Sequence, residues 1–286
     1  MTGPYVKRGV LVRVVYLVVS TVVLLAQRLV GIRPGTIVLC YHAVTRSQRP
    51  RFERQMHLVA RCPRPVASDS ASGSSTSQAI LVTFDDAFDC LRESAFPVMR
   101  ELGIPATVFV VSGNLGSAPK WSMPPGHPEA GLVTMDRAAI AALRGDPLIQ
   151  FGSHTVTHPR LAEIEPALAE SELAVSKREL EALTGRPVDF LALPHGSISP
   201  FVAGAARRAG YRAVFTLEPA VVHGVPADGL IGRFGVSPDM WMAEFRLTIA
   251  GAYAWLGPWR RFLRRLRALV SGSAVRGRLA VRASQS

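Results

Sequence analysis

Two kinds of hydrophobic pattern recur along this chain, and together they predict alternating strands and helices. Short apolar runs rich in β-branched residues are typical of buried strands, and they occur at residues 36–41, 80–84, 107–111, 147–151 and 190–193. Helix patterns or helix-ending signals lie between them at residues 51–58, 90–102, 136–144 and 166–184. The chain of 286 residues is long enough for one α/β barrel domain plus extensions.

The strand at residues 80–84 runs directly into two adjacent carboxylates, Asp85 and Asp86. Two aspartates at a strand end cannot both stay buried and unpaired, because desolvating each charge costs several kcal/mol. A metal ion removes the conflict if one carboxylate ligates it and the other keeps a proton-accepting role beside it. The alternative is a solvated Asp-Asp turn without chemistry.

A second polar segment follows the apolar run at residues 147–151 and contains His154 and His158. Two histidines four residues apart lie on the same side of one helical turn, or converge in a tight loop. Imidazole nitrogens suit a divalent metal, and Asp86 would supply a third ligand. Alone, a His-x-x-x-His spacing is weak evidence for a metal site. Together with the two aspartates at a strand end it is a specific signal.

These segments resemble the polysaccharide deacetylases of carbohydrate esterase family 4, which include the nodulation-type chitooligosaccharide deacetylases. Residues 83–86 (Thr-Phe-Asp-Asp) are similar to the first family motif, and residues 153–158 (Ser-His-Thr-Val-Thr-His) to the second. Weaker similarities lie at residues 96–110, 183–187 and 209–213, and the resemblance extends from about residue 37 to residue 236. It implies a distorted (β/α) barrel with fewer than eight regular strands and a site at their carboxyl ends.

The resemblance also implies substrate-binding residues in the segment Pro194-His195-Gly196. The family usually has Pro-Tyr-Gly there, and the backbone N–H after the proline helps to bind an oxyanion. His195 stands in place of the tyrosine, which preserves a backbone donor and adds a titratable group. Arg233 resembles a later arginine of the family and is expected to pair with Asp85.

His42 resembles the histidine in the Tyr-His-x-Val opening of the poly-N-acetylglucosamine deacetylase branch, where this early histidine is the general acid. A lone histidine at a strand end is otherwise usually structural. The implied reaction is hydrolysis of an N-acetyl group from an amino sugar, in a polysaccharide or a lipid-linked glycan. Asp86, His154 and His158 would hold a divalent metal, with zinc expected, and Asp85 would be the base.

One departure from the family lies directly after the two aspartates, where Ala87 replaces the usual glycine. Glycine permits backbone angles that are closed to other residues, so Ala87 is expected to strain the turn by about 1 kcal/mol or more. Two rival functions follow. One is a non-catalytic, membrane-bound glycan-binding or assembly protein on the same fold, and the other is an amide hydrolase acting on a non-sugar substrate.

Two segments around the barrel have simpler interpretations. Residues 114–131 are rich in Gly and Pro, carry Trp121, and are long for a plain connection, so a loop over the site mouth is expected. Trp121 is accordingly a candidate substrate-binding residue. The helix at residues 166–184 has Leu168, Leu173, Leu180 and Leu183 at helical spacing, and its charged residues are interpreted as a solvated face.

The N-terminal segment at residues 10–30 is almost entirely apolar. Its uncharged part, residues 14–27, spans only about 21 Å as a helix, which is short for a bilayer core of about 30 Å unless Arg13 and Arg28 reach the interface. No clear small-residue cleavage site follows, which favours an anchor over a cleaved signal peptide. The sequence favours a membrane-spanning anchor and a helix in the membrane plane equally. Basic residues flank the segment on both sides, so the positive-inside rule does not predict which end faces the cytoplasm.

The opposite end of the chain carries a basic amphipathic pattern. At residues 258–270, apolar side chains share one face and five arginines occupy the rest, which is typical of in-plane membrane binding, with a partner-protein groove as the alternative. The net charge of +12 also favours an anionic surface; without a nucleic-acid motif, membrane lipid is the expected partner and nucleic acid is not.

These patterns divide the chain into four parts. Residues 1–34 are the membrane anchor or in-plane helix, 35–240 the catalytic barrel, 241–270 an amphipathic membrane-associating segment, and 271–286 a disordered basic tail. The three cysteines, Cys40, Cys62 and Cys90, cannot all pair within one chain and lack the spacing of a zinc site. Cys40 and Cys90 lie in apolar surroundings and are expected to be small core residues.

Overall fold

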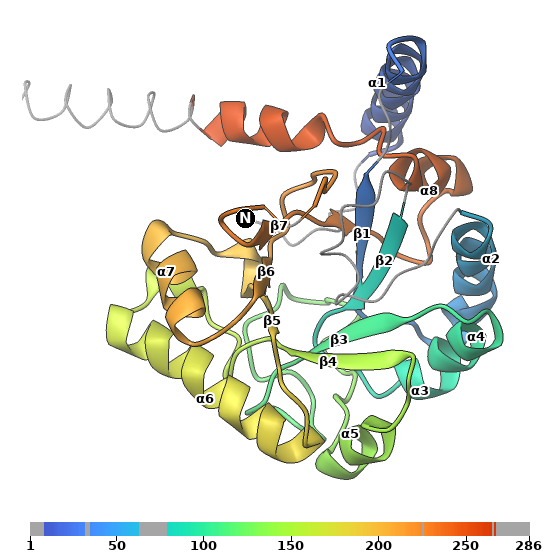
Figure 1. Cartoon of the computed structure of the whole chain (residues 1–286). Helices are drawn as coiled ribbons and strands as arrows, with labels where there is room; N and C mark the ends of the chain where they lie inside the picture. The colour runs from blue at the N-terminus through green and yellow to red at the C-terminus, as the bar shows by residue number, and fades with distance from the viewer. Residues whose placement is uncertain (1–8, 32–34, 63–78, 225, 265, 267–286) are drawn as a thin grey trace, which may run out of the picture.

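Figure 1 shows the computed structural model of the chain, which describes residues 9–31, 35–62, 79–224, 226–264 and 266. The predicted loop before the Asp-Asp strand and the predicted tail at 271–286 lie outside these residues. The elements alternate along the chain, and all strand pairings are parallel. The architecture is therefore an α/β fold in which helices connect parallel strands.

Eight strands form one sheet in the order β7-β6-β5-β4-β3-β2-β1-β8, curled into a half-barrel. They are β1 Thr36–Tyr41, β2 Ala79–Phe84, β3 Ala106–Val110, β4 Ile149–Ser153, β5 Phe190–Ala192, β6 Ala213–Phe215, β7 Leu230–Ile231 and β8 Phe234–Gly235. The distorted barrel predicted from the sequence is confirmed. The expectation of fewer than eight regular strands holds only if the two-residue strands β7 and β8 are left out.

The two edges of the curled sheet are neighbours in the sequence. β7 pairs with β6 at one edge, β8 pairs with β1 at the other, and only Gly232 and Arg233 lie between β7 and β8. A Cβ on Gly232 would lie 2.5 Å from the Glu218 carbonyl oxygen, so the crossing needs a residue without a side chain. These two residues connect the open edges and bring Arg233 into the interior, where it is fully buried.

Helices cover the convex side of the sheet (Figure 1). The α-helices are α1 Val10–Leu29, α2 Arg49–Ala60, α3 Leu91–Ser94, α4 Phe96–Glu101, α5 Arg137–Leu143, α6 Pro166–Thr184, α7 Pro200–Arg208 and α8 Met242–Ile249, and the short 3-10 helices are η1 Arg46–Gln48, η3 Leu161–Glu163 and η4 Pro194–Gly196. The single helix predicted at residues 90–102 is wrong. It is divided into α3 and α4 because Pro97 lies in the first turn of α4, where it cannot donate a backbone hydrogen bond to α3.

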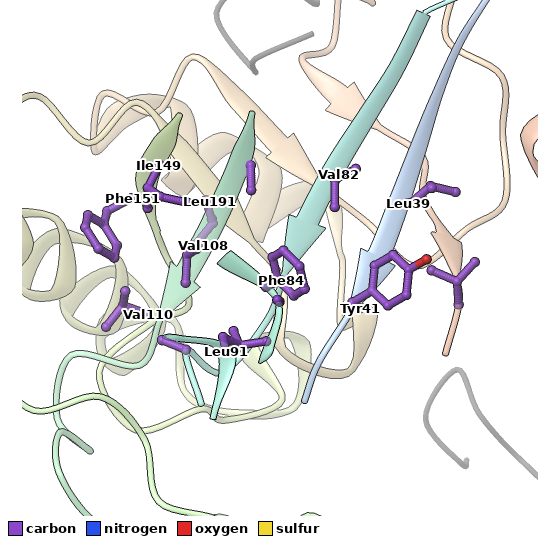
Figure 2. Packing of buried hydrophobic residues seen from close by; sticks show 14 of the residues in the cluster. Leu39, Tyr41, Val82, Phe84, Leu91, Val108, Val110, Ile149, Phe151 and Leu191 are labelled. Atoms are coloured by element: carbon purple, nitrogen blue, oxygen red, sulfur yellow. The ribbon is translucent and has the colours of Figure 1, made fainter. Parts of the chain in front are cut away.

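Successive strand residues alternate between two apolar layers. The larger cluster joins Leu39, Val82 and Val108 to apolar residues of the covering helices, and Figure 2 shows this packing. The smaller cluster contains Val38, Leu81 and other strand residues that line the concave interior. Because side chains of a strand alternate between its faces, the period of two decides which residues reach the interior.

That alternation carries polar groups to the carboxyl end of the interior. On β1, Val38 and Cys40 point inward and the next residue of that set is His42; on β2, Leu81 and Thr83 are followed by Asp85. The register pairs Tyr41, the last residue of β1, with Phe84, the last residue of β2. His42 and Asp85, the next residue of each chain segment, are therefore neighbours. The interior is therefore apolar at one end and reactive at the other.

α1 lies against α8 and the turn that follows it. Arg13 forms a two-pronged ion pair with Glu244 and lies 3.8 Å from the ring centre of Trp241. Farther along the helix, Tyr16 packs edge-on against Trp255, whose indole N–H donates to the Ser20 hydroxyl at 3.1 Å. The N-terminal helix is thus fastened to the barrel by charged, aromatic and hydrogen-bonded contacts.

Gly152 permits close packing inside the half-barrel and provides a test of it. A Cβ at this position would lie 2.6 Å from two ring carbons of the buried Phe109. We expect Gly152→Ala to lower stability by about 1–3 kcal/mol through overpacking, seen as a fall of roughly 3–10 °C in the melting temperature. Gly145→Ala is the matched control, since nothing lies within 4 Å of its Cβ position. Equal melting temperatures for the two variants would contradict the packing.

Candidate metal centre and active site

The turn after β2 directs two neighbouring carboxylates into one buried space. Asp86 and Ala87 both have left-handed backbone angles, with φ of 68° and 49°. The Ala87 carbonyl accepts a hydrogen bond from the Met135 backbone N–H at 2.8 Å, which holds the turn in place. Ala87 therefore does adopt the backbone region that favours glycine, as its replacement of the family glycine predicted. Its methyl group is buried in the larger core cluster, which offsets part of the strain of about 1 kcal/mol.

The second segment approaches the same space from β4. His154 directly follows the strand, while Thr155 and His158 have left-handed φ values of 69° and 62°. The two histidines therefore converge through a tight loop, the second of the two arrangements that the spacing allowed. The His158 backbone N–H donates to the Thr155 hydroxyl at 3.0 Å, which closes the loop on itself.

Glu172 of α6 secures this loop from outside. Its carboxylate accepts hydrogen bonds from the backbone N–H groups of Val156 and Thr157, at 2.8 and 2.9 Å, and from the Thr157 hydroxyl at 2.6 Å. On the same helix, Glu179 accepts from the Ser112 hydroxyl at 2.6 Å. The interpretation of the α6 charges as a solvated face is therefore wrong for Glu172, which is partly buried, whereas Glu179 remains exposed.

Asp86, His154 and His158 form a buried group suited to a metal ion. Asp86 Oδ1 lies 3.6 Å from His154 Nε2 and 3.5 Å from His158 Nε2. Ligands about 2.1 Å from a tetrahedral ion would be about 3.4 Å apart, close to both distances. His154 Nδ1 lies 2.8 Å from the Ala192 carbonyl oxygen, which orients the other ring nitrogen toward Asp86.

An unsatisfied polar atom supports the same interpretation. Asp86 Oδ1 is buried and has no hydrogen-bond partner among the described residues. A buried polar atom without a partner is costly, and a cation bound by Asp86 would remove that cost for the carboxylate. The donor set of one carboxylate and two imidazoles fits a divalent transition metal such as zinc.

The protonation of the three side chains follows from their burial. Burial raises the pKa of Asp86 to about 7, with opposition from nearby His42 and reinforcement from the Asp85 carboxylate. Burial lowers the pKa of His154 to about 4 and moves the pKa of His158 well below its usual range. Both imidazoles are therefore neutral and ready to ligate, while protons compete with a metal chiefly at Asp86.

Asp85 has a different partner. Arg233 donates to its two carboxylate oxygens at 2.6 and 2.9 Å, and all of these groups are almost completely buried. The predicted pairing of Arg233 with Asp85 is confirmed. Burial alone would raise the pKa of Asp85, but the Arg233 guanidinium, with help from His154, holds that pKa well below its usual range.

The surroundings of Arg233 fix its position. Its Nε donates to the Thr216 carbonyl at 3.1 Å and one terminal nitrogen donates to the Thr83 hydroxyl at 3.2 Å. The guanidinium carbon also lies 5.4 Å from the ring centre of Phe109. Cys40 is buried as predicted, but its Sγ lies 3.4 Å from Asp85 Oδ2, so it borders this carboxylate as well as the core.

His42 lies at the end of β1 on the same side of the barrel. The loop at 114–131 reaches this residue's neighbourhood, because Glu129 accepts a hydrogen bond from the Ala43 backbone N–H at 3.3 Å. Burial would lower the pKa of His42, but the carboxylates of Glu129, Asp86 and Asp85 outweigh it and raise the pKa above its usual value. An imidazole with a raised pKa is suited to donate a proton.

Two further residues predicted for the site, Trp121 and His195, have their rings beside the ring of His158. The rings of Trp121 and His195 each have their centres 4.6 Å from the centre of the His158 ring. Burial lowers the pKa of His195, with Arg160 contributing to the shift. Pro194 is buried and Gly196 has a φ of 63°, so the Pro194-His195-Gly196 segment forms a fixed turn beside the histidines.

The structure thus brings together the residues that the sequence nominated and adds two more. Glu129 and Glu172 were missed because each contacts a backbone far away in the chain, and the sequence contains no local signal for such a contact. His223, another histidine of the chain, lies beside Gly35 at the amino end of β1, away from the site.

Comparison with known proteins agrees with this geometry. A family model described as polysaccharide deacetylase matches residues 72–214, which is 143 of the 286 residues. The chain is 27% identical over 174 residues to YxkH, a Bacillus subtilis protein named as a polysaccharide deacetylase, covering 61% of this chain and 55% of that protein. It is 22% identical over 170 residues to the poly-β-1,6-N-acetyl-D-glucosamine N-deacetylase of Staphylococcus aureus, covering 57% and 56% of the two chains.

A solved structure, that of IcaB from Ammonifex degensii, has a similar fold. It is 25% identical, with a TM-score of 0.64, and the similarity covers 77% of this chain and 98% of that one. This chain spans only about half the length of the curated relatives it matches.

The metal centre leads to a prediction about binding and its pH dependence. Purified protein is expected to hold about one divalent ion per chain, and His154→Ala to lose it. Since the pKa of Asp86 is raised to about 7, metal affinity should fall about tenfold per pH unit below pH 7 and level off above it. Elemental analysis and competition with a chelator measure both effects.

His57→Ala is the matched control for that experiment, since His57 is an exposed histidine of α2 outside the centre. It should leave the metal content and the pH dependence unchanged. An unchanged metal content in His154→Ala would contradict the assignment of the centre.

Proposed function

This chain belongs to the polysaccharide deacetylase family, and we propose that it hydrolyses N-acetyl groups of an amino-sugar polysaccharide or a lipid-linked glycan. The single observation that supports this most strongly is that two adjacent carboxylates have different partners. Asp85 is paired with Arg233, whereas Asp86 lies among the two histidines. Amide hydrolysis needs both a base and a group that stabilises developing negative charge, and this arrangement supplies each.

Three side chains would hold the cofactor. Asp86, His154 and His158 offer one oxygen and two nitrogens within 4.8 Å of one another, and zinc is the ion we propose for them. When bound, a divalent cation would polarise the amide carbonyl and lower the pKa of water.

Asp85 would accept the proton of the attacking water as the new C–O bond forms. Its pairing with Arg233 keeps it ionised at neutral pH, and each carboxylate oxygen retains a lone pair after accepting one guanidinium hydrogen bond. The same pairing makes it a weaker base, so the site depends on the acidity of the water as well as on Asp85.

His42 would then donate its proton to the amine nitrogen as the C–N bond breaks, releasing a free amine and acetate. Glu129 and the two aspartates raise the pKa of His42, which favours the protonated form that this step requires. The backbone N–H of His195 would stabilise the oxyanion. Trp121, next to His158, would offer an aromatic face to the sugar ring.

The proposal also includes membrane association. By length and composition α1 could cross a membrane, although a signal sequence or a core helix meets the same criteria. Only one of the residues in this helix, Ser20, is buried.

Release of acetate tests the proposed reaction. We expect turnover on soluble N-acetylglucosamine oligosaccharides with β-1,4 or β-1,6 linkages. Asp85→Asn should lower turnover by about a hundredfold or more while retaining the metal, and His42→Ala should act similarly. Asp89→Asn is the control, because Asp89 is a partly exposed aspartate that pairs with Arg92 outside the centre.

The rival functions give different results in the same assay. A non-catalytic glycan-binding protein would bind these oligosaccharides without releasing acetate, and an amide hydrolase of another class would act only on non-sugar amides. Full activity of His42→Ala would shift the role of the acid to His195.

A further inference from the structure

α1 presents one face to the barrel from Arg13 to Ser20. Arg13, Tyr16 and Ser20, spaced three and four residues apart, make the contacts with α8 and Trp255. Val23, Leu24 and Gln27 continue the same face and are only partly exposed. Since a helix has 3.6 residues per turn, this stripe lies along a single side from Arg13 to Gln27.

The other sides of α1 are apolar and uncovered by described residues. The exposed side chains include Val10, Leu11, Val14, Val15, Val18, Val22, Leu25 and Leu29, several of which are more than half exposed. Contiguous apolar surface of this size is unusual on a protein surrounded by water and marks an interaction site. The aliphatic residues cover a curved surface around the helix rather than one flat patch, which suits lipid chains better than a second copy of this chain.

A second helical segment, residues 256–264 and 266, exposes apolar side chains as well. Trp259, Phe262 and Leu266 lie on one face, are 45%, 55% and 47% exposed, and two of their rings stack at 5.8 Å. Arg261 and Arg264, by contrast, pair with Glu218 of the barrel. The arginines therefore attach this segment to the barrel, and the aromatic face points outward. Trp and Phe side chains are frequent at membrane interfaces.

α1 and the turn that leads into the second segment lie at the amino end of β1. The turn after α8 approaches the start of β1, because a Cβ on Gly251 would lie 3.3 Å from the side chain of Ile37. Trp255 of this turn supports α1, and Figure 1 shows α1 and the C-terminal helical residues at the same end of the molecule. Asp86 and His42 lie beyond the opposite ends of β2 and β1, and six residues of strand span about 20 Å.

We propose that α1 lies in the plane of a bilayer containing anionic lipid, together with Trp259, Phe262 and Leu266, and that the catalytic centre faces away from that bilayer. The inference rests on the membrane association proposed above and not on the deacetylase chemistry. A spanning orientation would separate Arg13 from Glu244 and Ser20 from Trp255, whereas the in-plane orientation keeps every contact of the docked stripe.

This geometry also selects among substrates. A centre about 20 Å from the bilayer, on the far end of the barrel, favours a polysaccharide reached from water over a sugar held at the lipid surface. The net charge of +12 strengthens attraction to anionic lipid at either orientation and does not distinguish the two.

The test measures depth in the membrane at several positions of the full chain. The protein is reconstituted with vesicles of phosphatidylcholine and phosphatidylglycerol, with Cys62 and Cys90 replaced by Ser. Single environment-sensitive labels are attached at Leu11→Cys, Val18→Cys, Leu25→Cys and Leu29→Cys, which share one face of α1, and are quenched by lipids brominated at different depths. The in-plane orientation predicts nearly equal, shallow depths at all four positions.

A label at Val133→Cys provides the control for orientation, because Val133 is exposed and lies next to the turn after β2. It should remain unquenched. Replacing both Trp259 and Phe262 with Ser should weaken vesicle binding about tenfold or more without changing acetate release from a soluble oligosaccharide.

Three results would overturn the inference, and they are distinguishable. Depth that is greatest at residue 18 and small at residues 11 and 29 would mean a spanning helix, with membrane association itself retained. Failure of the full chain to float with vesicles would reject membrane association altogether. A lipid-independent dimer that dissociates in Val18→Asp would assign the apolar face to a second copy of the chain.

Discussion

The buried pair of Arg233 and Asp85 is the interaction on which the rest of the site depends. Two adjacent aspartates at the end of β2 are almost inaccessible to water, and two unpaired buried charges would be prohibitively costly. Arg233 stabilises one carboxylate as an anion, which leaves Asp86 as the group that needs a cation. Removing one partner of such a pair typically lowers the stability of the fold by about 3–5 kcal/mol. Folding itself therefore requires Asp85, and not Asp86, to pair with Arg233.

The topology explains how a residue so far along the chain reaches Asp85. β7 and β8 are the two edges of the sheet, and the two residues that connect them pass over its open side. Gly232 allows the close passage and Arg233 projects into the interior beside Phe109. The same strand register that points Thr83 inward also points Asp85 inward, so the ion pair follows from how the sheet closes.

Much of the site was predictable because its signals are local. Asp85, Asp86, His154 and His158 follow strand ends, and the carboxyl ends of parallel strands meet at one side of a sheet. Arg233 was predictable only through family resemblance, since nothing near it in the sequence indicates a partner. Glu172 and Glu129 could not be found, because their partners are backbone groups fixed only after folding. The packing of α1 on the barrel could not be predicted for a similar reason. Its apolar sequence does not indicate that Glu244 and Trp255 contact one side of the helix.

In the proposed mechanism, Arg233 keeps Asp85 ionised as the base. The most direct measurement is the acid limb of the pH dependence of kcat/KM for acetate release, compared between the natural protein and Arg233→Lys at equal, saturating metal content. Lysine keeps a positive charge but cannot form the two-pronged pair, so burial should raise the pKa of Asp85 and move the acid limb upward by about one pH unit or more. An acid limb at the same pH in both proteins, with metal content unchanged, would contradict the account.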